Sequence, residues 1–277
     1  MHILHSLFQH DPPGASICTV GAFDGVHLGH QQLIHAVVNQ AHAQRAQSVV
    51  VTFYPHPRIF LGRAPEIYLT TPEEKAEQMA ALGVDALVIF PFDERTRQIS
   101  AGDFIQNMID GLRMVSLWIG PDFALGKQRQ GNAQYLAELG RERGFEVNVL
   151  PPVNVGPERI SSTRIRQSLA RGDLRDVNLC LGRPFRVIGK WLDARHAQVP
   201  PHHALPPPGI YPVWICDAPN EADLTMIRQR GWHPPDHAAR DIADGIHAAD
   251  ADADAIRVIR LAEPIHFCER VEIDFVG

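Results

Sequence analysis

Hydroxyl side chains are almost absent from the C-terminal third of this 277-residue chain. Residues 169–277 contain no serine and a single threonine, Thr225. A kinase needs a hydroxyl that helps to hold its metal and a base placed at the acceptor oxygen. The composition of this segment therefore argues against kinase chemistry within it.

Cysteine is also scarce, and its positions suit neither a metal site nor a disulfide framework. The four cysteines are Cys18, Cys180, Cys216 and Cys268. The first 13 residues contain histidines and an acid where a signal peptide would need an apolar segment. We therefore expect an enzyme of the reducing cytoplasm.

Long apolar runs and a basic excess are missing as well. No run approaches the length that crosses a bilayer, and the formal net charge of −6 does not favour nucleic acid. We expect neither a membrane nor a nucleic-acid partner, so any anion site must be local. The length and the 45% hydrophobic content predict one or two domains, and leave the oligomeric state open.

Short apolar strands alternate with amphipathic helices through about residue 150. The expected strands are 17–20, 49–53, 86–90, 116–119 and 146–150, and the expected helices are 31–44, 72–82, 102–113 and 132–143. This alternation predicts an α/β fold, a doubly wound parallel sheet that binds its ligand at the carboxyl ends of the strands.

A strand exit, a turn, two imidazoles and a helix start fall within ten residues, Gly21-Ala-Phe-Asp-Gly-Val-His27-Leu-Gly-His30. The start of a helix favours an anion through its unpaired N–H groups and its dipole. Gly29 allows a phosphate to come close to the backbone. His27 and His30, three residues apart, can donate hydrogen bonds to one phosphate group. A half zinc site and an ordinary surface or core role are the alternatives, and phosphate chemistry is favoured over both.

A second phosphate motif is predicted at Ile160-Ser-Ser-Thr-Arg-Ile-Arg166, ahead of a short helix. The hydroxyls of Ser161, Ser162 and Thr163 serve equally well as helix caps. Arg166 is more informative, because its guanidinium can bind two phosphate oxygens at once.

These two motifs and three further segments resemble the FAD synthetase family, which forms the N-terminal half of bifunctional riboflavin kinase/FAD synthetases. The further segments are Thr52-Phe-Tyr-Pro-His-Pro57, Gly120-Pro-Asp-Phe-Ala-Leu-Gly126 with Arg129 and Gly131, and Leu181-Gly-Arg-Pro184. The resemblance covers the first two-thirds of the chain. It implies a Rossmann-like fold of the HxGH nucleotidyltransferase type. It also implies transfer of AMP from ATP to FMN, with Mg²⁺, to give FAD and pyrophosphate.

The resemblance also assigns roles to residues. His27, His30 and Arg166 are expected to be catalytic, and no residue is assigned as a metal ligand. The nucleotide is expected at Gly21, Ala22, Phe23, Asp24, Gly29, Ser161, Ser162 and Thr163, and the flavin at Phe53, Pro55, His56, Pro57, Phe123 and Arg129. Asp122 is expected to meet the ribose or magnesium. As an alternative, Pro-His-Pro is simply a turn, and the loop that runs on to Leu69 is long enough to act as a flap.

The sequence departs from the family at several points. Pro121 stands where an acid is common, Ala124-Leu125 replaces Arg-Phe, and Ala22 replaces Asn or Thr. The flavokinase Gly-rich loop and Pro-Thr-Ala-Asn motif are missing, and residues 197–208 are rich in proline and histidine instead. A non-catalytic flavin or nucleotide binder and a cytidylyltransferase for a small phosphorylated alcohol are therefore the alternative functions.

We expect a nucleotidyltransferase domain at residues 1–182 and a small, degenerate antiparallel β-barrel at 183–277. Its expected strands are 185–192, 209–216, 224–228, 256–261 and 264–275, with an exposed loop at 233–254. Five histidines of this region, His202, His203, His233, His237 and His247, are expected to be solvated surface residues.

Overall fold

The computed structural model describes residues 1–8, 12, 14–193, 196–217, 239–241, 257–260 and 270–276. The chain forms two compact units. The first comprises Met1–Glu66 and Pro72–Ile160, and the second comprises Ile67–Thr71 and Ser161–Gly277.

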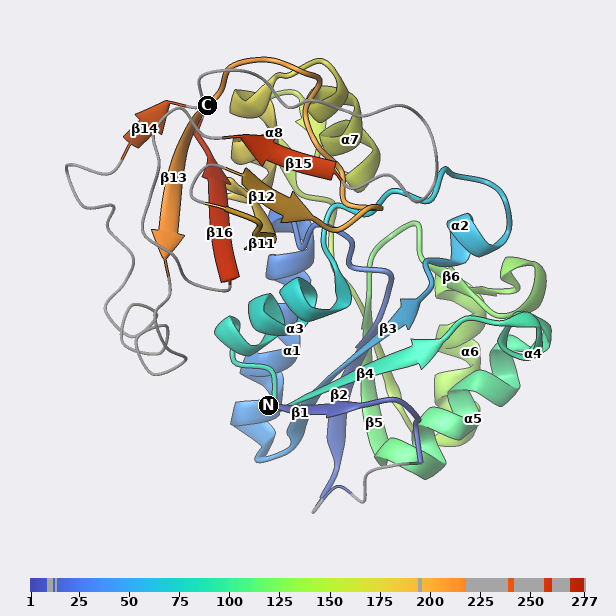
Figure 1. The fold of residues 1–277 in the computed structure, drawn as a ribbon. Coiled ribbons are helices and arrows are strands. Elements are labelled where there is room, and N and C mark those ends of the chain that lie inside the picture. Colours follow the sequence, from blue (N-terminus) through green and yellow to red (C-terminus); the bar gives the residue numbers. More distant parts are fainter. Residues whose placement is uncertain are drawn as a thin grey trace. The chain divides into compact units, whose positions relative to one another are not determined.

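A six-stranded parallel sheet is the centre of the first unit, as the sequence predicted (Figure 1). Its strands are β1 (His2–Leu4), β2 (Ser16–Val20), β3 (Gln47–Tyr54), β4 (Ala86–Pro91), β5 (Met114–Ile119) and β8 (Glu146–Val149), in the order β1-β4-β3-β2-β5-β8. Every strand of this sheet except β1 was predicted from the sequence. Its three residues are too few for a periodic signal, and pairing with β4 extends the sheet by this edge strand.

Helices cover both faces of this sheet, because each helix buries one apolar stripe against it. The long helices are α1 (Leu28–Gln44), α3 (Pro72–Ala81), α5 (Ala101–Leu112) and α6 (Ala133–Arg143). Buried residues of α1 and α3 share one cluster with Val50 and Leu87. Those of α5 and α6 share another with Val49 and Val51. The sheet is therefore doubly wound.

The chain order places a crossing point beside β2. From β2 the chain continues to β3 and β4 on one side, and then crosses to β5 and β8 on the other. In open α/β sheets, ligands bind at such a switch point, beyond the carboxyl ends of the strands. The turn after β2 and the loop after β5 both begin there.

Short elements fill the connections of the first unit. They are α2 (Pro57–Phe60), α4 (Glu94–Gln98), the 3₁₀ turn η1 (Lys127–Arg129), and the paired strands β6 (Ala124–Leu125) with β7 (Gly131–Asn132) and β9 (Asn154–Val155) with β10 (Glu158–Arg159). The loop with β6 and β7 lies against the start of α5, where a Cβ at Gly126 would clash with the backbone nitrogen of Ala101. Gly126 also has a φ of 76°, so both the lack of space and the backbone conformation favour glycine at this position.

The second unit combines two helices with a curled antiparallel half-barrel. The helices are α7 (Ser162–Ala170) and α8 (Leu174–Leu181). The strands are β11 (Phe185–Trp191), β12 (His196–Val199), β13 (Pro212–Asp217), β14 (Ala239–Asp241), β15 (Arg257–Arg260) and β16 (Arg270–Phe275), in the order β14-β13-β16-β11-β12-β15. Val187, Ile273 and Phe275 belong to its buried core.

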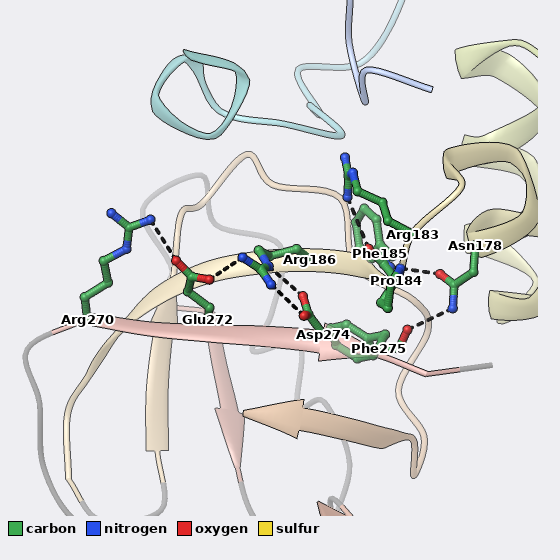
Figure 2. A network of polar contacts seen from close by, with 9 residues as sticks. All are labelled: Asn178, Arg183, Pro184, Phe185, Arg186, Arg270, Glu272, Asp274 and Phe275. Atoms are coloured by element: carbon green, nitrogen blue, oxygen red, sulfur yellow. Dashed lines mark hydrogen bonds and ion pairs between the residues drawn. The ribbon is translucent and has the colours of Figure 1, made fainter. Parts of the chain in front are cut away.

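Polar contacts hold α8 and the central strands of this half-barrel together (Figure 2). Asn178 accepts a hydrogen bond from the Phe185 backbone N–H at 2.8 Å and donates one to the Phe275 carbonyl at 3.0 Å. Arg186 binds both carboxylate oxygens of Asp274 at 2.7 Å and also pairs with Glu272. Arg270 approaches the other oxygen of Glu272 at 3.1 Å.

Two expectations for this region were wrong. His203 is buried rather than solvated, because its ring lies 5.8 Å from that of Phe185. The insert expected as a loop contains β14, because backbone pairing with β13 gives this edge strand a place that its polar sequence did not signal. The expected strand 224–228, the remainder of the insert, His233, His237 and His247 lie outside the described residues. The boundary expected between residues 182 and 183 stays a prediction, while the compact units divide after Ile160.

Candidate active site

His27 begins α1 and caps it. Its Nδ1 accepts a hydrogen bond from the backbone N–H of His30 at 3.2 Å, and its own backbone is extended. The helix therefore starts at Leu28, not at Gln31 as expected, because an imidazole supplies the cap that Ser, Asp or Asn usually provides. With Nδ1 used as an acceptor, the neutral ring of His27 carries its proton on Nε2.

The two imidazoles lie together, as their spacing predicted. Their ring centroids are 3.6 Å apart and the planes differ by 15°, so the rings are stacked. Phe23 contacts the His30 ring edge-on at 5.1 Å. Gly29 leaves room for this pair, since a Cβ there would lie 3.2 Å from Cε1 of His27. The Nδ1 of His30 is buried without a hydrogen-bond partner among the described residues.

Both rings are held neutral. Burial lowers the pKa of His27 to about 4, against the raising effects of its backbone hydrogen bond and Asp24. Burial also places the pKa of His30 well below its usual value, and His27 and Lys75 lower it further. A neutral imidazole keeps one N–H donor, and at a helix N-terminus this donor is available to an anion.

The turn between β2 and α1 is strained. Phe23 and Val26 have φ values of 47° and 41°, in the left-handed region that a β-branched residue rarely occupies. Such geometry persists only where the surroundings hold it. Gln31 donates a side-chain hydrogen bond to the Val26 carbonyl at 2.9 Å. Gly21 is tied to β3 by its N–H, 3.0 Å from the Val51 carbonyl.

Lys75 and Thr52 complete this turn, and sequence reasoning assigned a role to neither. Lys75 donates to the Ala22 carbonyl at 2.7 Å and to Thr52 Oγ1 at 3.2 Å. The signal in the sequence that could have identified Lys75 is its position beside Ala76 and Met79, which are buried residues of α3.

The Pro-His-Pro segment forms a local turn at the end of β3. His56 caps α2, with its Nδ1 accepting from the Arg58 N–H at 3.0 Å, and Pro57 is the first residue of that helix. The bond between Tyr54 and Pro55 is cis. Phe53 packs among the rings of Phe90, Phe92 and Phe104, at centroid distances of 6.4, 5.7 and 6.0 Å. The turn alternative is therefore observed, and a role in flavin binding stays a prediction.

Asp122, Phe123 and Arg129 lie in the loop after β5. Phe123 packs against the core shared with α5. Arg129 donates to the Asp122 carbonyl at 3.1 Å, while the Asp122 carboxylate pairs with Arg159. Within the described part of the chain, no three side chains of the metal-binding types lie close enough to hold an ion.

From Ser161 onward, the second phosphate motif belongs to the second unit. Ser161 caps α7 by accepting from the Arg164 N–H at 3.1 Å. Arg164 forms a two-point ion pair with Asp176, at 3.2 and 2.5 Å, and this pairing lowers the pKa of that carboxyl. Ser162 and Thr163 form the first turn of α7, where Arg166 approaches the Ser162 carbonyl at 3.4 Å. The association of this motif with His27 and His30 stays a prediction.

No described helix is long and apolar enough to span a membrane. The stacked imidazoles at the first turn of a helix, on the carboxyl edge of a doubly wound parallel sheet, define an α/β protein of the HxGH nucleotidyltransferase type. Within that class the chain belongs to the FAD synthetase family, whose model matches residues 9–164. The resemblance inferred from the motifs is thereby confirmed.

Two curated relatives carry the name bifunctional riboflavin kinase/FMN adenylyltransferase. That of Listeria monocytogenes is 36% identical over 175 residues, which cover 62% of this chain and 55% of the relative. That of Escherichia coli K12 is 32% identical over 243 residues, which cover 83% of this chain and 77% of the relative. The match thus spans little more than half of the Listeria protein.

A solved structure shares the fold. It is described as a macrolide-efflux protein from Streptococcus pneumoniae, with a TM-score of 0.76 and 21% sequence identity over 99% of this chain and 88% of that one. At this identity, the likeness establishes the fold alone.

Proposed function

We propose that this protein is an FMN adenylyltransferase, which transfers AMP from ATP to FMN and releases pyrophosphate. The observation that carries the proposal is the stacked, neutral pair of His27 and His30 at the start of α1. The relatives' name supplies the substrates. The imidazole donors at a helix N-terminus support the proposal, because such a position favours the binding of an anion.

In the proposed reaction, a phosphate oxygen of FMN forms a bond to the α-phosphorus of ATP. The bond from that phosphorus to the pyrophosphate oxygen breaks, so FAD and pyrophosphate account for all atoms. Nε2–H of His27 and the His30 ring donate to oxygens that gain charge, and Arg166 acts on the same triphosphate. No covalent enzyme intermediate is required, because positioning and electrostatics supply the catalysis.

Mg²⁺ enters this proposal as part of the ATP substrate. Magnesium is usually held by substrate phosphates with one or two carboxylates, so it needs no cage of protein ligands. Asp24 and Asp122 are the acids of the two loops. Asp24 is buried and its charge acts on His27, whereas Asp122 is paired with Arg159. Asp24 suits the role better, since the Asp122 carboxylate is already paired with a guanidinium.

The remaining assignments follow from this reaction. The turn at Gly21, Ala22 and Phe23 would receive adenine, with Gly29 admitting phosphate and Ser161, Ser162 and Thr163 gripping the triphosphate. The flavin would be framed by Phe53, Pro55, His56, Pro57, Phe123 and Arg129. The catalytic segment would be residues 1–182.

The test is a product analysis. The full-length protein is incubated with FMN, Mg²⁺ and each nucleoside triphosphate in turn, and the products are resolved by chromatography. FAD formed with ATP supports the proposal. A flavin–cytidine product, or cytidylyl transfer to a phosphorylated alcohol, favours the cytidylyltransferase alternative. Flavin binding without turnover favours a non-catalytic binder.

We also propose that the chain lacks riboflavin kinase activity, because residues 169–277 have no serine and one threonine. Riboflavin with ATP and Mg²⁺ should give no FMN and no ADP. The matched control is a bifunctional relative assayed under the same conditions. Stoichiometric formation of FMN and ADP, by an activity that co-purifies with this chain, would contradict the proposal.

A further inference from the structure

Lys75 is a buried cation that links three separate elements of the first unit. Lys75 is 7% exposed, and it belongs to the buried residues of α3. The ammonium donates to the Ala22 carbonyl, which lies in the turn after β2, and to the Thr52 hydroxyl on β3. Thr52 in turn donates to the same Ala22 carbonyl at 3.0 Å. These three bonds form a closed triangle.

The carbonyl that receives both donors immediately precedes a strained residue. Phe23, with φ of 47°, follows Ala22 and contacts His30. Three residues later, Val26 is also left-handed, and Gln31 holds its carbonyl. The strained turn is thus clamped at both ends, and the imidazole pair follows it directly. Strain of this kind persists where the surroundings over-determine it, most often at functional sites.

A buried ammonium costs stability unless it is paired and hydrogen-bonded, so a buried lysine points to a role that an apolar side chain could not fill. Among the described residues no carboxylate forms an ion pair with it, and Asp24 is the acidic group whose charge acts on it. Burial lowers the pKa of Lys75 to about 8. An apolar residue of similar length would remove this cost while filling the same space.

We propose that Lys75 is a positioning residue, which holds the turn from Ala22 to Val26 in the strained shape that receives the nucleotide and aligns His30. The inference rests on the proposed adenylyl transfer. Thr52 shares the task, because its hydroxyl binds the same carbonyl. His30 faces His27 on its own helix and Lys75 on α3, so the ammonium also helps to keep the His30 ring uncharged.

The experiment compares three variants of the full-length chain. Lys75→Met removes the ammonium and keeps the length of the side chain. Thr52→Val removes the second donor and keeps the shape. Lys190→Met is the matched control, because Lys190 is an exposed residue of β11. Each variant is assayed for kcat and KM with ATP and FMN, for thermal stability, and for amide hydrogen exchange of residues 21–26.

We expect Lys75→Met to raise KM for ATP at least tenfold and to lower kcat, with a melting temperature equal to or above that of the parent. Thr52→Val should raise KM for ATP by a smaller factor. In the double variant, the fold-change in KM should be smaller than the product of the two single fold-changes. Lys190→Met should behave as the parent. Faster hydrogen exchange at Phe23 and Gly25 in Lys75→Met should accompany the kinetic change.

Parental exchange rates and parental KM in Lys75→Met overturn the proposal. If Lys75→Met does not fold, Thr52→Val decides, and parental kinetics in that variant also overturn it. Absence of FAD formation by the parent protein would defeat the proposed function instead. In that case the exchange rates of residues 21–26 still test the clamp, since they are measured without substrates.

Discussion

At the scale of single residues, the candidate chemistry depends on two imidazoles that burial keeps uncharged. His27 is 6% exposed and uses Nδ1 to cap α1, which leaves Nε2–H as its donor. A donor fixed by the backbone needs no reorganisation when a phosphoryl oxygen gains charge. Nδ1 forms the capping bond and Nε2–H would make the proposed contact to phosphate, so the two roles involve different atoms of one ring and variants can separate them.

Replacing His27 by Asn should separate the two roles. Asn is a good helix cap, so the variant keeps the acceptor for the His30 N–H, whereas His27→Ala loses it at a cost of about 1 kcal/mol in stability. Both variants lose the Nε2 donor, so both should lose kcat by on the order of 100-fold, about 3 kcal/mol. Urea denaturation and initial rates of FAD formation measure the two effects. A His27→Asn variant with parental kcat would remove His27 from the mechanism.

The depressed pKa of His27 also predicts how stability depends on pH. The folded ring binds its proton near pH 4, while the unfolded ring does so near 6.5. The contribution to stability is complete above pH 6.5 and is lost as the pH falls toward 4, because the unfolded chain then takes up a proton that the folded state does not.

Two measurements check this pH dependence. The His27 ring signal, assigned by its absence in His27→Asn, should not titrate between pH 8 and 5.5 in NMR spectra of the folded protein. The denaturation midpoint should fall over pH 6.5 to 5, and by less in His27→Asn than in the parent. A His27 ring that titrates near 6.5 would show that it is solvated.

At the scale of elements, α1 is fixed at both ends. At its start the His27 ring provides the cap. Toward its end, Gln40 accepts from Trp118 at 2.5 Å and from Ser116 at 3.1 Å, and donates to Glu146 at 3.2 Å. These contacts join the helix to β5 and β8, on the other side of the crossing point from β3. The imidazole pair is therefore held on an element that the sheet keeps in place.

Gly29→Ala tests whether the first turn of α1 is shaped for the imidazole pair. Alanine in a helix stabilises by up to about 1 kcal/mol relative to glycine, but its Cβ would press on the His27 ring, 3.2 Å away. We expect unchanged or slightly higher stability, and at least a tenfold loss of kcat/KM for adenylyl transfer.

The control for that variant is Gly102→Ala, because Gly102 is likewise the second residue of a helix, α5. Its new Cβ would meet the ends of the flexible Tyr135 and Arg143 side chains, 3.2 and 3.4 Å away. It should keep parental kinetics. Parental kcat/KM in Gly29→Ala would show that the ring has room to move.

At the scale of the whole molecule, the second compact unit includes a segment from well before its main part in the sequence. The segment Ile67–Thr71 belongs to it, and Tyr68 exchanges two backbone hydrogen bonds of 2.7 Å with His202 and Ala204. The loop expected to act as a flap up to Leu69 is thus anchored from Ile67 onward. Its movable part, in any proposal for flavin binding, is restricted to the residues before this pairing.

Replacing Arg186 is expected to cost more stability than replacing an exposed charged residue. Glu272 and Asp274 are 1% and 2% exposed, so Arg186→Met leaves two buried carboxylates short of a partner (Figure 2). Breaking a buried ion pair from one side typically costs about 3–5 kcal/mol. Thermal and urea denaturation should show this loss, and Glu272→Gln with Asp274→Asn should restore part of it.

The exposed pair of Arg97 and Glu94 supplies the comparison, with side chains that are 51% and 61% exposed. Arg97→Met should cost at most about 1 kcal/mol, since water already screens that pair. Equal losses of stability in Arg97→Met and Arg186→Met would show that burial does not determine how much the ion pairs of Arg186 contribute.

Local patterns in the sequence were sufficient for the parallel sheet and the long helices. Apolar runs and helical stripes are properties of neighbouring residues, so the strand at 49–53 and the helix at 72–82 could be predicted directly. The spacing of His27 and His30 also predicted that their rings lie together. The start of α1 was misjudged by three residues, because the cap is a histidine ring and its capping bond is visible only in three dimensions.

Tertiary structure alone decided the rest. Lys75 stands 53 residues from Ala22 in the chain, so no local pattern relates them, and only the packing of α3 beside β3 brings its ammonium to that carbonyl. The pairing of Tyr68 with residue 203 and the buried network of Arg186 arise in the same way, from segments distant in sequence. The sequence by itself determined which chemistry the first turn of α1 can offer. Burial and long-range hydrogen bonds determined its charge, its tautomer and the clamp that holds it, because these depend on neighbours that only folding supplies.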